Sequence, residues 1–407
     1  MEFIVTALGI SADFRTSADS GIPAWAVLAL ASTPAFGSEQ QGGFHTAGDV
    51  LVDRTADGVP LQQLWDTQRD LLSAWASHQD AVTSLLAFKT TEVAEAVPQT
   101  MAKFTFEEAS EFGEPKGARH GDFLLVSADF RDYDLATRFT WKFLRDATAR
   151  QVEHDMNSAL ESDQRLRSAK ILQRIFSPTQ GLSPEGNPIY GLFNGSDGIT
   201  PLEYMGKSFD DEHTHYLVSG NATLDSADVE DSIKLITEHG YGLTPGSRIL
   251  VFANESECDK IASWRAGEES RSSGPKAKHD FVPSSDAPAF LSSEFIVGEK
   301  PPAEWNNLRV MGSYGRAWIV PTPLIPTGYV LTAATSGNDS SENICMYRHH
   351  PNPAYQGLRV IPGLRPGYPL IDSFYQRSFG VGVRTRAGAV VTQIKASGDY
   401  ETPTISV

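Results

Sequence analysis

The stretch that decides the fold of this chain is residues 134–176, which read DLATRFTWKFLRDATARQVEHDMNSALESDQRLRSAKILQRIF and contain neither proline nor glycine. Apolar residues recur at four-residue spacing in two groups: Leu135, Phe139 and Phe143, then Val152, Met156 and Leu160. This spacing predicts a helix with an apolar stripe along one side. A continuous helix of this length would span about 65 Å at ~1.5 Å per residue; two helices with a break near Ser162 are the alternative. A rod of that length is typical of an extended, lattice-forming subunit rather than a globular enzyme.

Composition narrows the classes of function. The chain has 407 residues, with 34 Lys and Arg against 51 Asp and Glu, and a net charge of −17. This charge disfavours direct nucleic-acid binding, which needs basic side chains to neutralise phosphates. The two cysteines form neither a disulfide framework nor a cysteine zinc cluster, so we expect a reducing compartment. The apolar run at residues 22–31 is too short to span a membrane, and the acidic residues before it argue against a secretory signal.

The first part of the chain predicts an arm that carries one helix. Residues 1–59 show little helical periodicity, and residues 60–88 have apolar side chains at three- and four-residue spacing. Pro60 suits the first turn of that helix. We expect the helix to pack either in the core of its own subunit or on a neighbouring subunit.

Residues 100–131 predict a long hairpin. Phe104 and Phe106 alternate with polar residues, which is the period of a half-buried strand, and residues 123–126 form the second strand. An isolated two-stranded ribbon is marginally stable, so we expect this hairpin to lie on another subunit. The candidate interface consists of large apolar side chains and charged residues at the tip: Phe104, Phe106, Phe123, Leu125, Glu111, Glu114, Lys116 and Arg119.

The second half of the chain predicts an α/β region and a long β tail. A connector rich in glycine and proline, residues 181–201, separates it from the long helix. Asp225 predicts the start of a helix that stops at His239, and Asn254 predicts the start of another. Strands are expected at residues 248–253, 295–297, 317–320 and 329–332, followed by one extended segment over residues 374–394.

Four stretches of this sequence resemble the major capsid proteins of tailed bacteriophages with the Hong Kong 97-type fold. Their amino-acid sequences are similar to those of capsid proteins from phages of actinobacteria. They are residues 211–220 (DEHTHYLVSG), 239–242 (HGYG), 357–363 (GLRVIPG) and 368–384 (YPLIDSFYQRSFGVGVR). The resemblance covers about residue 100 to the end. It implies an α+β fold with five parts: residues 1–99 as an N-terminal arm, 100–131 as an extended loop, 132–210 as a peripheral domain with a spine helix, 211–345 as an axial domain, and 346–407 as the return to the peripheral domain with a long strand and C-terminal tail.

The resemblance also implies a function. The chain would be a structural subunit, not an enzyme, that self-assembles into hexamers and pentamers to form an icosahedral head in the host cytoplasm. Its implied partners are copies of itself, scaffolding, portal and decoration proteins, and enclosed double-stranded DNA held without sequence-specific binding; no membrane and no cofactor are implied. An encapsulin-like nanocompartment shell protein is one alternative, and a metal-assisted hydrolase that uses His213 and His215 is another.

Three short motifs suggest chemistry, and none predicts a catalytic residue. His213 and His215 place two imidazoles on one strand face, which could bind a metal, but the spacing identifies no third ligand. We therefore expect a packed or hydrogen-bonded pair and no metal. Gly206-Lys207-Ser208 imitates the end of a phosphate-binding loop, but proline stands where the loop needs its first glycine. Gly380 and Gly382 favour close backbone approach within a strand over dinucleotide binding.

Overall fold

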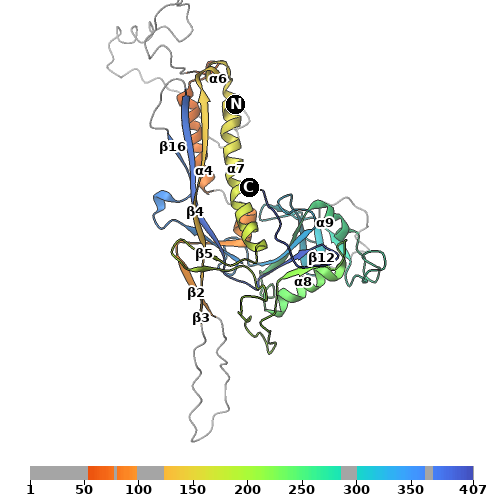
Figure 1. Cartoon of the computed structure of the whole chain (residues 1–407). Helices are drawn as coiled ribbons and strands as arrows, with labels where there is room; N and C mark the ends of the chain where they lie inside the picture. The colour runs from red at the N-terminus through yellow and green to blue at the C-terminus, as the bar shows by residue number, and fades with distance from the viewer. Residues whose placement is uncertain (1–53, 78–79, 99–122, 286–299, 363–369, 407) are drawn as a thin grey trace, which may run out of the picture.

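The computed structural model describes residues 54–77, 80–98, 123–285, 300–362 and 370–406. It has an elongated body and a compact lobe at the side of that body (Figure 1). The body holds a β-ribbon flanked by helices, and the lobe holds a second sheet with two further helices. No helix in the described ranges is long and apolar enough to cross a membrane.

A two-stranded ribbon runs the length of the body. β4 (Asp129–Thr140) pairs antiparallel with β17 (Leu370–Val383), from Asp129 opposite Val381 to Thr140 opposite Leu370. Three further strands complete a five-stranded sheet: β16 (Leu358–Pro362), β15 (Cys345–His349) and β1 (Ala87–Thr90). The helix expected from residue 134 is therefore wrong over residues 134–140, which form a strand. A spacing of four places residues on one side of a strand as well as of a helix, and pairing with β17 selects the strand.

The helical part of the deciding stretch starts later and breaks earlier than the spacing predicts. α6 (Trp141–Asp146) and α7 (Ala149–Phe176) are separated at Ala147 and Thr148, not near Ser162. The side chain of Gln151 accepts a hydrogen bond from the Thr148 N–H at 2.8 Å, which fixes the start of α7. α7 has 28 residues and is about 42 Å long, so it runs beside most of the ribbon (Figure 1).

The segment expected as one helix over residues 60–88 is two helices and a strand. α4 (Leu61–Ser77) starts directly after Pro60, as expected, and α5 (Ala81–Leu86) starts at the cap Asp80, whose carboxylate accepts from the Thr83 N–H at 3.1 Å. The chain then enters β1. Apolar side chains of α4 pack against the α6–α7 junction and those of α5 against α7, so this segment lies in the core of its own subunit.

The lobe is a seven-stranded sheet with helices on one face. Its strand order is β7 (Tyr216–Val218), β18 (Ala389–Gln393), β14 (Tyr329–Thr335), β8 (Arg248–Ala253), β13 (Ala317–Pro321), β12 (Gly312–Tyr314) and β9 (Phe281–Pro283). Alternate residues of β8 divide between two cores: Val251 packs among the residues beneath α8 (Ser226–Glu238) and α9 (Glu255–Ala262), and Phe252 joins the core of the body. The lobe and the body are therefore joined by continuous packing.

Several predictions for this region are confirmed and one is wrong. Asp225 and Asn254 cap α8 and α9, α8 ends at His239, and β8 occupies the expected residues. The tail, expected as one extended segment, is two strands in two sheets: β17 ends at Val383 in the body and β18 belongs to the lobe. Residues 295–297 lie outside the described ranges.

The predicted hairpin has a well-defined base. β2 (Ala94–Pro98) pairs antiparallel with β3 (Phe123–Ser127) at the end of the body opposite α6. Six of the candidate interface residues lie outside the described ranges: Phe104, Phe106, Glu111, Glu114, Lys116 and Arg119. Short elements elsewhere are β5 (Gly181–Leu182), β6 (Pro188–Ile189), β10 (Glu304–Trp305), β11 (Leu308–Arg309) and a 3-10 turn at Pro353–Tyr355.

Candidate functional site

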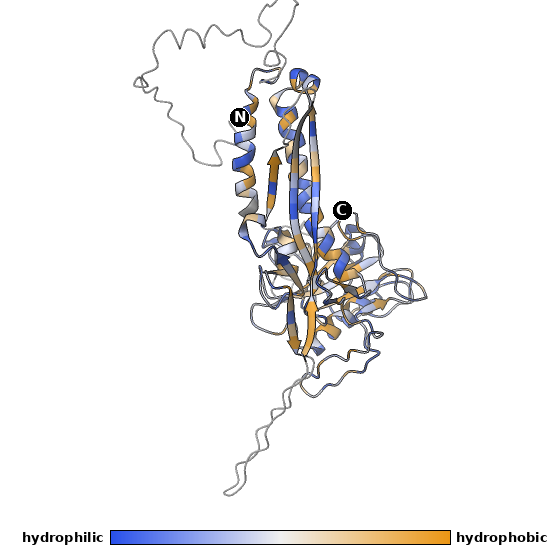
Figure 2. Cartoon of the chain, turned by 60° about the vertical axis from the view of Figure 1, so that its left-hand side comes forward, coloured by the Kyte–Doolittle hydropathy of each residue, from blue (hydrophilic) through white to orange (hydrophobic). Residues whose placement is uncertain are grey.

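The base of the hairpin presents an apolar surface to solvent. Phe123 and Leu125 are 64% and 42% exposed, although both are large hydrophobic side chains. Leu124 and Val126, on the other face of β3, pack in a small core with Phe88 and other residues of the body. Figure 2 shows β3 as a mostly hydrophobic strand at this end of the body. One face of the strand is thus covered by its own subunit and the other is uncovered.

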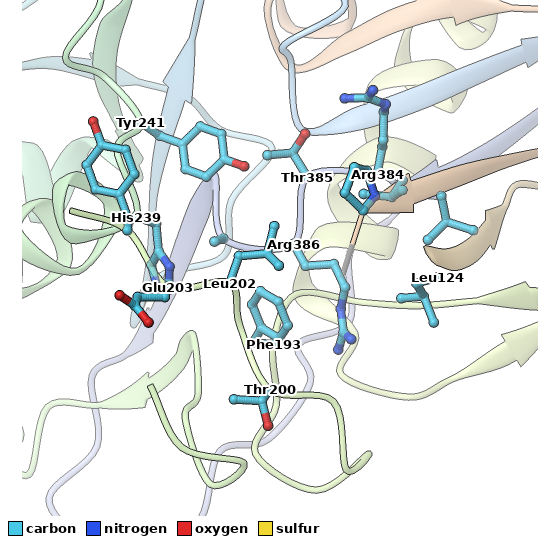
Figure 3. Close-up of a pocket in the computed structure, with 15 residues that line it drawn as sticks. Leu124, Phe193, Thr200, Leu202, Glu203, His239, Tyr241, Arg384, Thr385 and Arg386 are labelled. Carbon is cyan, nitrogen blue, oxygen red and sulfur yellow. The ribbon is translucent and has the colours of Figure 1, made fainter. Parts of the chain in front are cut away.

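A pocket of about 240 Å³ lies where the hairpin base meets the lobe (Figure 3). Leu124 lines one side, His239 and Tyr241 line the other, and Arg386 and Phe193 lie between them. The Arg386 guanidinium is 4.4 Å from the centroid of the Phe193 ring. It also donates to the backbone carbonyls of Gly191 and Leu192 at 3.0 and 3.2 Å. These contacts of Arg386 hold Gly191 and Leu192 in place. They therefore fix this part of the connector, residues 181–201, although it is rich in glycine and proline.

A buried ionic cluster joins α7 to the ribbon. Asp163, Arg167 and Arg377 are each 5–6% exposed. The Asp163 carboxylate accepts from Arg377 Nη2 at 2.9 Å and from the indole N–H of Trp75 at 3.1 Å, and it forms an ion pair with Arg167 at 3.3 Å. One carboxylate thus ties together α4, α7 and β17.

Two strand glycines allow close backbone approach, as the sequence predicts. A Cβ atom on Gly380 would collide with the carbonyl oxygen of Asp129, and one on Gly382 would collide with the carbonyl oxygen of Ser127. β17 can therefore cross the β3–β4 segment only without side chains at these positions. Lys207, in the stretch that imitates a phosphate-binding loop, pairs with Glu238, and no helix begins directly after Ser208.

Three histidines meet at the edge of the lobe sheet. The Nε2 atom of His213 lies 3.1 Å from that of His215 and 2.9 Å from that of His239. The Nε2 atoms of His215 and His239 are 3.2 Å apart. Burial lowers the pKa of all three; the pKa of His215 falls well below its usual range and that of His239 falls to about 3, where the neighbouring His213 and Lys207 add to the effect. His239 is the member that sequence spacing misses; the available signal was a histidine at the predicted end of a helix.

Comparisons with known proteins give one strong similarity. No family model matches the chain, and no curated protein matches it. Among solved structures, the chain is similar to one from Mycobacterium phage Patience, with 38% identity and a TM-score of 0.67 over 90% of this chain and 97% of that chain. It is also similar to the capsid of a native GTA particle (13% identity, TM-score 0.45, 78% of this chain and 91% of that chain) and to the mature capsid of bacteriophage PhiM1 (10%, 0.43, 79% and 89%). Both of these TM-scores lie below 0.5.

Proposed function

The chain belongs to the major capsid proteins of tailed bacteriophages with the Hong Kong 97-type fold, and from this premise we propose that the exposed face of its hairpin joins neighbouring subunits of the shell. The protein is a structural subunit that associates with copies of itself to form an icosahedral capsid. The 38% identity to a phage chain favours a phage head over an encapsulin-like compartment.

One observation carries the proposed contact. Phe123 and Leu125 are exposed on the same strand whose other face, with Val126, is buried in the subunit core. Fully burying a leucine or phenylalanine side chain is worth about 1.5–3 kcal/mol. A contact on this face would recover that free energy once per subunit, and a closed symmetric shell repeats the contact many times.

The same proposal covers the other predicted interface residues and partners. We propose that the same contact includes Phe104 and Phe106 as apolar residues, and that charged residues of the predicted tip, all outside the described ranges, would set its register on the neighbour: Glu111, Glu114, Lys116 and Arg119. We propose that the subunits form hexamers and pentamers in the host cytoplasm and meet scaffolding, portal and decoration proteins there. The net charge of −17 suits a wall that encloses double-stranded DNA without binding its sequence.

The test compares the two faces of β3. We expect the double variant Phe123→Ser/Leu125→Ser to unfold at the same urea midpoint as the wild-type subunit, because these side chains are exposed there. Negative-stain microscopy and size-exclusion chromatography of the overexpressed variant should show few shells or none. Loss of subunit stability, or normal yields of shells, would contradict the proposal.

The matched control is Val126→Ser, which changes the buried face of the same strand, one position from Leu125 and three from Phe123. It leaves a cavity and buries a hydroxyl group, so the unfolding free energy of the subunit should fall by about 2 kcal/mol or more. Substitutions on the exposed face of β3 should therefore impair shell assembly, and the substitution on its buried face should lower the stability of the subunit.

A further inference from the structure

We propose that His213, His215 and His239 bind one divalent transition-metal ion, zinc by the chemistry of its ligands, at the edge of the lobe sheet where α8 ends. Among the described residues, this is the one group of three or more histidine, cysteine or acidic side chains whose ligand atoms converge.

The distances fit such an ion. Zinc lies about 2.0–2.1 Å from histidine nitrogens, so two of its ligand nitrogens are about 2.9 Å apart at a coordination angle of 90° and about 3.4 Å apart at the tetrahedral angle. The observed separations of 2.9, 3.1 and 3.2 Å fall within this range. The ring centroids are 5.1, 4.9 and 5.1 Å apart, farther in each pair than the Nε2 atoms, so the three imidazoles turn these nitrogens toward one another.

Hydrogen bonds among the three rings cannot satisfy all three contacts at once. Each Nε2 atom either carries a proton or presents a lone pair. With three mutually close nitrogens, at least one of the three contacts must bring together two N–H groups or two lone pairs, and both pairings repel. An ion at the centre accepts all three lone pairs and removes the conflict.

The tautomer of His215 is already the one that a metal requires. Its Nδ1 lies 2.7 Å from the carbonyl oxygen of Ala389. A carbonyl can only accept, so Nδ1 carries the proton, and in the neutral ring Nε2 then presents its lone pair to the other two histidines. A backbone carbonyl behind a ligand histidine is the usual support of a metal site.

The rings are also held in place by the ends of regular elements. His213 and His215 do not lie within a strand, as their spacing suggests, but flank the isolated bridge at Thr214 just before β7 starts. The His215 N–H donates to the carbonyl of Phe193 at 2.8 Å, and the His215 carbonyl accepts from the Val391 N–H at 2.9 Å. His239 is the C-cap of α8.

Aromatic side chains cover part of the cluster, and one side remains open. The Phe209 ring stacks on His239, with centroids 3.9 Å apart and planes at 20°. His215 is fully buried, whereas His213 is partly exposed. A water molecule can therefore complete the coordination on the His213 side. Charges of both signs act on His213: the carboxylates of Asp210 and Glu238 favour positive charge there, and the ammonium group of Lys207 opposes it.

In this position the ion would join three segments that are far apart in the sequence: the end of α8, the entry to β7 and, through Ala389, the tail strand β18. We infer a structural role for it, which fixes the lobe helix to the strands that lead back to the body.

Metal binding is measured on the full-length protein after dialysis against a chelator. Cobalt(II) titration of the wild type should produce visible d–d absorption that saturates at one ion per chain. His239→Ala and His213→Ala should lose this signal, with affinity at least about 100-fold weaker, because changes at supporting residues alone cost 10–100-fold. The control is His154→Ala, an exposed histidine on α7, which should titrate like the wild type.

Thermal unfolding supplies a second readout. Zinc should raise the unfolding temperature of the wild type and of His154→Ala, magnesium should not, and zinc should have no effect on His239→Ala. If His239→Ala fails to fold, His213→Asn at the partly exposed position serves in its place. A wild type without cobalt absorption or zinc stabilisation would overturn the proposal, as would variants that keep both. Neither readout depends on shell assembly.

Discussion

The buried side chain of Asp163 should contribute strongly to the stability of the body. It lies inside α7, where its carboxylate faces two arginines, Arg167 and Arg377, and the indole N–H of Trp75. Asp163→Asn keeps the shape but removes the only negative charge of this ionic cluster. Removing one partner of a buried ion pair costs about 3–5 kcal/mol, so we expect a large fall in the urea midpoint of the subunit.

The control for this change is Asp146→Asn. Asp146 pairs with Arg145 on the surface of α6, and both side chains are exposed. Solvent screens this pair, so its loss should leave the midpoint unchanged. Equal effects of the two substitutions would mean that the buried cluster does not stabilise the body.

His349 should make the stability of the subunit depend on pH. Burial, helped by the positive charges of Lys89 and Arg377, lowers the pKa of His349 to about 4 from its usual 6.5. Below pH 6.5 the unfolded chain therefore binds more protons at this residue than the folded chain, so stability falls as the pH drops from about 6.5 to about 4.

Urea unfolding of the wild type and of His349→Gln over this pH window tests the prediction. The variant should lose less stability than the wild type between pH 6.5 and 4, and the two should run parallel above pH 7. Parallel curves across the whole window would show that His349 is not the titrating group.

At the scale of elements, the ribbon depends on the two glycines of β17. Gly382→Ala would place a methyl group against the backbone carbonyl of Ser127, which cannot move aside as a flexible side chain can. Overpacking of this kind costs about 1–3 kcal/mol, so thermal unfolding should occur at a lower temperature. Gly181→Ala is the control, because its methyl group would meet only Ile189 at 3.9 Å, and it should unfold like the wild type.

At the scale of the whole molecule, the structure revises where the arm can be cut. The lack of helical periodicity in residues 1–59 predicts that all of them can be deleted from a folded subunit. Asp57, however, accepts from the Ala149 N–H at 3.0 Å and caps α7, and Ala56 donates to the carbonyl of Ala147 at 2.9 Å. We therefore expect a chain lacking residues 1–53 to remain folded and to assemble poorly.

A chain that lacks residues 1–59 should in addition be less stable. Loss of a helix cap costs about 0.5–2 kcal/mol, which should appear as a lower urea midpoint of the longer deletion relative to the shorter one. Equal midpoints would show that residues 54–59 do not support α7, and normal shells from the shorter deletion would show that the arm is dispensable for assembly.

Local signals in the sequence predicted the elements whose causes are local. Asp225 and Asn254 started helices where expected, because a cap needs only its own side chain and the next three N–H groups. The apolar run of β8 is a strand buried on both faces, and the glycines of β17 allow close approach. Of the apolar residues predicted for the hairpin interface, Phe123 and Leu125 fall on the exposed face of β3.

The sequence by itself determined a long helix, the caps of the two lobe helices and the strand at residues 123–126, and its resemblance to a known family implied the α+β fold. Only the tertiary structure decided which residues of the long stretch are strand, where the tail leaves the body for the lobe, and that His239 meets His213 and His215. The reason is the same in each case. Apolar residues at a four-residue spacing lie on one side of either a helix or a strand. Pairing with β17 selects the strand for residues 134–140, and β17 is more than 200 residues further along the chain. Likewise, packing of α8 across β18 brings His239 to the other two histidines, and no spacing along the chain encodes that contact.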